Sequence, residues 1–110
     1  MITVTETAWF TKRAEKLLPL EEKMELINYI ASNPKSGDVI AKTGGVRKLR
    51  YARKGQGKSG SFRIVYYYYN AKNPVFLFEI FGKNEKSNIS DAEKVELQKI
   101  IKELKKELKS

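Results

Sequence analysis

The side chains in this sequence that could do chemistry are cations. The chain contains no histidine and no cysteine, so the usual general base, the commonest metal ligand and any thiolate site are missing. Grouped arginines and lysines can instead bind phosphate and stabilise the charge that develops when a phosphodiester bond breaks. The candidate catalytic residues are Lys48, Arg50, Arg63, Lys83 and Lys86.

Such a set of cations could cleave RNA without a metal ion or a cofactor, and we expect neither. RNA carries its own nucleophile, the 2′-hydroxyl group. The protein has to place that oxygen in line with phosphorus, stabilise the pentacoordinate charge and protonate the leaving oxygen. A lysine whose pKa is lowered by neighbouring cations could serve as base or as acid. The sequence does not assign these two roles to individual residues.

The elements that must position these cations are strands. Runs rich in β-branched and aromatic residues predict them in the middle of the chain. They are expected at residues 46–52, 61–69 and 75–81. Side chains alternate between the two faces of a strand, so Lys48 and Arg50 share one face of the first strand. The last run is apolar at nearly every position, which predicts a central strand buried on both faces.

Helices are expected on either side of these strands, because apolar residues recur there at helical spacing. The expected elements are a short strand at residues 2–5 and helices at residues 6–18, 20–32 and 91–108. Thr5 is the expected N-cap of the first helix, and Ser90 with Glu93 forms a capping box for the last. The short link between the first two helices predicts an antiparallel hairpin.

This order of elements predicts a small α+β fold with a mainly antiparallel sheet, an N-terminal helical hairpin and a C-terminal helix. We expect the helices to cover one face of the sheet and to leave the other face free. Lys48, Arg50 and Arg63 then converge on the free face, with residues 55–60 and 83–86 at its rim. Grouped cations repel one another, so an anion such as RNA phosphate is the natural occupant.

Composition agrees with a polyanionic partner. The 110 residues carry a net charge of +9, from 22 basic and 13 acidic side chains, which favours nucleic acid, an acidic protein or a membrane surface as partner. The alternative is that the basic surface only keeps the protein soluble. The length predicts one domain over residues 1–110. No targeting segment or membrane span is visible, so we expect a cytoplasmic protein without a membrane partner.

The glycine-rich loop at residues 53–60 contains two misleading motifs. Gly55, Gly57 and Gly60 match G-x-G-x-x-G, and Gly57-Lys58-Ser59 resembles the end of a P-loop. Both motifs require a helix to follow, whereas a strand is expected here. We therefore interpret the loop as a basic hairpin tip that could touch phosphate.

Four segments together carry a family resemblance. They are TGGVRKLR at residues 43–50, KGQGKSG at 54–60, FRIVYY at 62–67 and IFGKNEKS at 80–87. With the flanking helices, the chain resembles the HigB branch of the RelE superfamily over essentially its whole length. These proteins are the toxins of type II toxin–antitoxin pairs.

The resemblance implies a RelE-like microbial-RNase-type fold and an mRNA interferase, a ribosome-dependent endonuclease that cuts mRNA in the A site of the 30S subunit and stops translation. The ribosome would supply the orientation of the substrate. The resemblance also implies a HigA-type helix-turn-helix antitoxin as partner. Operator DNA would be bound only through the complex with that antitoxin.

The resemblance carries over to individual residues. Lys48 and Arg50 correspond to the basic pair of the family's first central strand, and Arg63 to its phosphate-contacting arginine. Asn84 and Ser90 stand where RelE has an arginine and a stacking tyrosine, and a lysine of the same segment is expected to replace the arginine. The residues expected to contact RNA are Lys54, Lys58, Tyr67 and Asn84.

Two other functions are compatible with the same residues. A non-catalytic module that binds RNA or an acidic protein needs the basic face but none of the transition-state chemistry. A ribosome-independent RNase would cut naked RNA.

Overall fold

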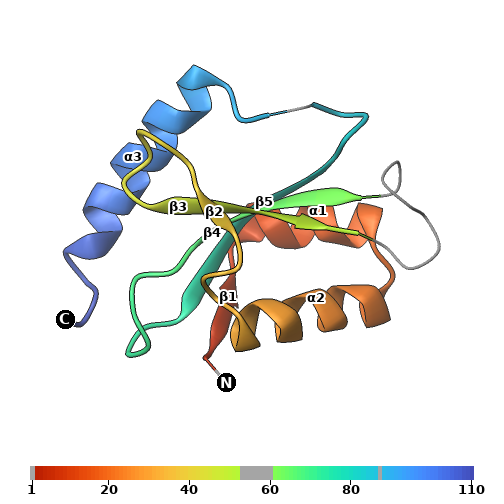
Figure 1. The fold of residues 1–110 in the computed structure, drawn as a ribbon, viewed down its shortest axis with the longest axis horizontal. Helices are drawn as coiled ribbons and strands as arrows, with labels where there is room; N and C mark the ends of the chain where they lie inside the picture. Colours follow the sequence, from red (N-terminus) through yellow and green to blue (C-terminus); the bar gives the residue numbers. More distant parts are fainter. Residues whose placement is uncertain (1, 53–60, 87) are drawn as a thin grey trace.

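A β-sheet lies at the centre of the structure, a computed structural model that describes residues 2–52, 61–86 and 88–110. The elements of this part of the chain are β1 (Val4–Glu6), α1 (Ala8–Leu17), α2 (Leu20–Ser32), β2 (Asp38–Val39), β3 (Val46–Tyr51), β4 (Phe62–Tyr67), β5 (Val75–Gly82) and α3 (Asp91–Lys105). The strands lie in the order β1-β5-β4-β3-β2 (Figure 1). Strand β1 is parallel to β5, and the other neighbours are antiparallel. The predicted α+β class, helical hairpin and C-terminal helix are confirmed.

The chain enters α1 later than predicted. Strand β1 extends to Glu6 and pairs with β5, so Thr5 lies within the strand and the prediction that it caps the helix is wrong. Thr7 is the N-cap: its Oγ1 accepts from the Phe10 N–H at 3.3 Å and donates to the Leu77 carbonyl at 2.8 Å. This second bond fastens the start of α1 to β5.

Helices cover both faces of the sheet, so the prediction of one wholly free face is wrong. Figure 1 shows α1 and α2 on one side and α3 on the other. On the α3 side, Val65 and Tyr67 of β4 are buried with Leu97 and Ile101 of α3. Apolar side chains on the second face of β4 have to be covered, and the apolar stripe of α3 covers them.

A β-bulge in β5 changes what this strand presents to α3. Glu79 lies opposite Val65, whereas Leu77 lies opposite Tyr66, so Phe78 is one residue too many for the ladder. Phe78 packs against the core on the α3 side, and Glu79 binds a side chain on that side as well. A bulge redirects side chains in this way, and it brings a carboxylate to the α3 face.

The helices of the described part of the chain include none with the length and apolar character needed to cross a membrane.

Candidate functional site

Three of the predicted cations share one face. The antiparallel register of β3 and β4 places Arg50 directly opposite Arg63, and Lys48 opposite Val65. Since alternate residues of a strand share a face, all three cations lie on the α3 side. Arg50 is exposed, whereas Lys48 and Arg63 are half-buried. The structure therefore brings together the residues that strand periodicity predicted.

The two arginines form a local excess of positive charge. Like charges directly opposite on neighbouring strands destabilise a sheet. Arg63 Nη1 donates to Ser61 Oγ at 3.0 Å, and among the described residues neither Arg50 nor Arg63 is paired with a carboxylate. The described part of the chain contains no group of three or more acidic side chains placed to hold a metal ion. The arrangement suits an anion that bridges the two guanidinium groups.

The chain from the end of β5 to the start of α3 crosses this face. We call its described residues, 82–86 and 88–90, the crossing segment. Asn88 Oδ1 accepts from Lys48 Nζ at 3.0 Å and from the Ile89 N–H at 2.9 Å. Ile89 is buried in the core below α3. The segment is thereby fastened to β3, two strands away from β5, and it fixes the position of one site cation.

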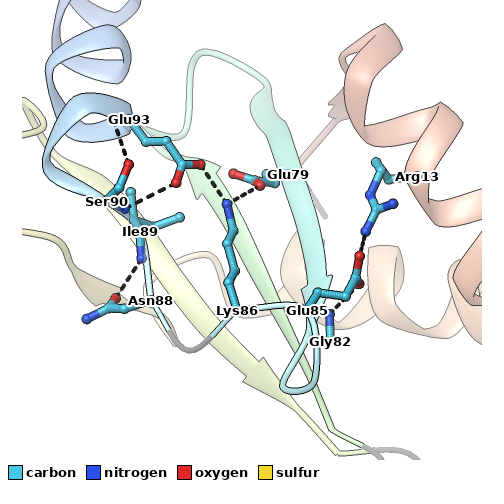
Figure 2. A network of polar contacts seen from close by, with 9 residues as sticks. All are labelled: Arg13, Glu79, Gly82, Glu85, Lys86, Asn88, Ile89, Ser90 and Glu93. Atoms are coloured by element: carbon cyan, nitrogen blue, oxygen red, sulfur yellow. Dashed lines mark hydrogen bonds and ion pairs between the residues drawn. The ribbon is translucent and has the colours of Figure 1, made fainter.

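Further bonds hold the two ends of the crossing segment (Figure 2). Glu85 Oε1 accepts from the Gly82 N–H at 2.9 Å, and the other carboxylate oxygen pairs with Arg13 of α1. At the far end, Ser90 and Glu93 form the predicted capping box, with bonds of 3.1 Å in both directions.

Lys86 is held by two carboxylates. Its Nζ lies 2.7 Å from Glu79 Oε1 and 2.6 Å from Glu93 Oε2, and 4.8 Å from the centre of the Phe81 ring. Burial by itself would lower the pKa of Lys86, but the hydrogen bonds and charges of Glu79 and Glu93 outweigh it and raise the pKa above its ordinary value. Lys86 is therefore protonated at neutral pH, with its charge compensated, which does not suit a general base.

Removing Lys86 from its ion pairs with Glu79 and Glu93 is expected to destabilise the protein by an amount that depends on pH. Burial would raise the pKa of Glu93, but Lys86 and Ser90 outweigh it and lower the pKa. A carboxylate whose pKa is lower in the folded than in the unfolded protein stabilises the fold at pH values above its unfolded-state pKa, and this stability is lost as the pH falls through its folded-state pKa. The raised pKa of Lys86 adds stability that is lost only at alkaline pH. Lys86→Met is expected to lower the free energy of unfolding by on the order of 1 kcal/mol at pH 7 and by less at pH 3.

Urea unfolding at the two pH values measures this difference. Lys99→Met is the matched control, because the Lys99–Glu96 pair spans 3.9 Å and both side chains are 71% exposed; it should have no measurable effect at either pH. A Lys86→Met effect that is the same at pH 3 and pH 7 would contradict a stabilising role of the Lys86 ion pairs.

The other predicted site residues lie apart from the three cations or in different surroundings. Tyr67 is 2% exposed, and its ring stacks on Tyr69 at 6.4 Å. Burial, followed by the charge of Tyr69, raises the pKa of Tyr67. Its ring therefore belongs to the core in this structure rather than to an open face. Lys83 and Asn84 are exposed in the turn after β5.

Lys54 and Lys58, predicted to contact RNA, lie outside the described residues.

Three contributors to the site were not predicted: Glu79, Asn88 and the ion pair between Glu93 and Lys86. Glu79 did leave a signal, as the one charged residue in an otherwise apolar strand. Glu93 was predicted only as a helix cap. Asn88 left no signal, because an asparagine in a polar segment does not reveal which side chain it will meet.

The chain matches a known protein family over nearly its whole length. Residues 2–110 match the family described as the RelE toxin of the RelE/RelB toxin–antitoxin system. The matched range includes β3, β4, β5 and the crossing segment, and therefore the whole cationic face.

Proposed function

Because the chain belongs to the RelE toxin family and is the toxin of a toxin–antitoxin system, we propose that it is a ribosome-dependent mRNA endonuclease of the HigB branch. The observation that carries this proposal is the cross-strand placement of Arg50 opposite Arg63 beside Lys48. Three cations without a carboxylate partner in the described part of the chain suit a phosphate on which negative charge increases during reaction.

The proposed reaction is attack within the RNA strand. The 2′-oxygen forms a bond to phosphorus and loses its proton to a base, while the bond from phosphorus to the 5′-oxygen breaks and that oxygen takes up a proton. Arg50 and Arg63 stabilise the additional negative charge. Lys48 uses one of its three N–H donors on Asn88 and has two left for a phosphate oxygen or a proton transfer.

The remaining lysines take different parts in this proposal. Lys83, exposed in the turn after β5, is the second lysine proposed for proton transfer. Lys86 acts as a positioning residue, because Glu79 and Glu93 hold its ammonium group. Lys54, Lys58 and Asn84 contact RNA.

The proposed partners follow from this function. The protein acts in the cytoplasm on mRNA in the A site of the small ribosomal subunit, where the ribosome orients the scissile phosphate. The cognate antitoxin is of the HigA type with a helix-turn-helix, and the complex of the two binds operator DNA.

A cleavage assay on programmed ribosomes tests the proposal. The purified protein is added to ribosomes stalled with a defined codon in the A site, and mRNA ends are mapped by primer extension. We expect cuts within the A-site codon and none in the same mRNA without ribosomes. Binding without cut product would support a non-catalytic module instead, and cuts in naked RNA would support a ribosome-independent RNase.

A further inference from the structure

An apolar groove of about 560 Å³ lies between α3 and the start of α1. Its apolar wall includes Trp9, Phe78, Leu97 and Ile100. Trp9 is 62% exposed and Ile100 45%. Large apolar side chains exposed together are unusual on a protein surface and mark sites of association.

The fold explains why the groove is open. Strand β1 ends at Glu6, opposite Leu77, and the chain then turns into α1. Among the strands that the structure describes, none pairs with β5 on that side past Leu77. The bulge turns Phe78 towards α3, and no described element covers the gap between this side chain and Trp9.

The charged residues that line the groove are all acidic, although the protein is strongly basic. Of the 13 acidic residues in a chain of net charge +9, three line this groove: Glu79, Glu93 and Glu96. A complementary segment would present apolar side chains together with a lysine or arginine. Two copies of this chain, each with a net charge of +9, would instead repel one another as they associate.

We propose that the groove binds an amphipathic segment of the cognate antitoxin, with apolar side chains on Trp9 and Ile100 and a basic side chain at the carboxylates. The partner follows from membership of a toxin–antitoxin family, so this docking site does not depend on the proposed nuclease activity.

Occupation of the groove would act on the cationic face from the side. Glu79 and Glu93 line the groove and also hold Lys86. A basic side chain of the antitoxin competes with Lys86 for these carboxylates, which loosens the crossing segment and with it the Asn88 contact to Lys48. This consequence rests on the proposed function, and it would allow the antitoxin to inhibit cleavage without covering Arg50 or Arg63.

Trp9 is the only tryptophan of the chain and reports directly on the groove. The probe is the cognate antitoxin, with any tryptophan replaced by phenylalanine. In the stoichiometric complex we expect Trp9 emission to shift to shorter wavelength and acrylamide quenching to fall at least twofold. Unchanged emission and quenching in a complex that forms would overturn the proposal.

A pair of charge variants locates the contact. Ile100→Glu is expected to raise the Kd for the antitoxin at least tenfold. Leu20→Glu, at a residue of α2 that is 71% exposed, adds the same charge elsewhere and should leave the Kd unchanged. Equal Kd values for both variants and the parent would place the antitoxin outside the groove.

Two controls separate this result from other causes. All binding is measured on the Arg63→Ala background, so the outcome is independent of cleavage, and circular dichroism confirms that the variants are folded. Light scattering of the free toxin tests self-association: a dimer that Ile100→Glu converts to monomer would assign the groove to a second copy and overturn the proposal.

Discussion

Replacing Arg63 with alanine is expected to lower the rate of mRNA cleavage on programmed ribosomes by about 100- to 1,000-fold, the range found when one donor to a developing oxyanion is removed. Arg63 is half-buried on β4, lies opposite Arg50 and donates to Ser61, so its guanidinium is fixed in place before the substrate arrives. Such a group loses little entropy on binding phosphate. Single-turnover cleavage with saturating toxin measures the chemical step apart from ribosome binding.

Two control variants separate the role of Arg63 from net charge and from folding. Lys16→Ala removes the same charge from an exposed position on α1 and should leave the rate unchanged. Arg63→Lys keeps the charge but loses the planar fork, so it should give a rate between those of the parent and Arg63→Ala. Arg63→Ala that cleaves at the parental rate, while remaining folded, would remove Arg63 from the site.

The sequence was informative about the cationic face because strand periodicity is a local property. Once Lys48, Arg50 and Arg63 are assigned to neighbouring strands, alternation alone decides which face each occupies. The structure adds the register that sets Arg50 against Arg63. A long connection between two strands does not by itself determine their register, so the sequence could not predict which residues lie opposite one another.

The arrangement of the helices could not be predicted in the same way. An apolar stripe shows that α3 must pack on something, but it does not show on which face of the sheet. Val65 and Tyr67 indicate the answer, because two large apolar side chains on the same face as Arg63 have to be covered by another element. The four consecutive tyrosines at residues 66–69 concealed it, because a tyrosine is equally acceptable at a wet and at a buried position.

The surroundings of Lys86 were concealed for a different reason. Its partners Glu79 and Glu93 are each seven residues away in the chain, on opposite sides. A bulge aims the first at α3, and the helix cap aims the second. Composition and periodicity do not show either orientation. The sequence therefore could not distinguish Lys86, which is ion-paired in the structure, from a lysine that is exposed to solvent without a partner.

The placement of α3 on the cationic side of the sheet predicts a large difference between two neighbouring isoleucines. Ile101 is 1% exposed and packs on the sheet, whereas Ile100 is 45% exposed on the groove side. A Cβ added at Gly44 would lie 3.2 Å from Ile101 Cγ2, so the turn before β3 already contacts this side chain closely. Truncating Ile101 therefore leaves a cavity that the turn has little freedom to fill.

Ile101→Ala is expected to lower the free energy of unfolding by about 2–5 kcal/mol, a large part of the roughly 5–15 kcal/mol that stabilises a domain of this size. Ile100→Ala removes the same atoms from a half-solvated position and gains helix propensity, so its effect should stay within about 1 kcal/mol. Urea unfolding followed by circular dichroism measures both variants. Small and equal effects would mean that α3 does not seal this face of the sheet, and the cations would then lie on a surface as open as the sequence alone predicted.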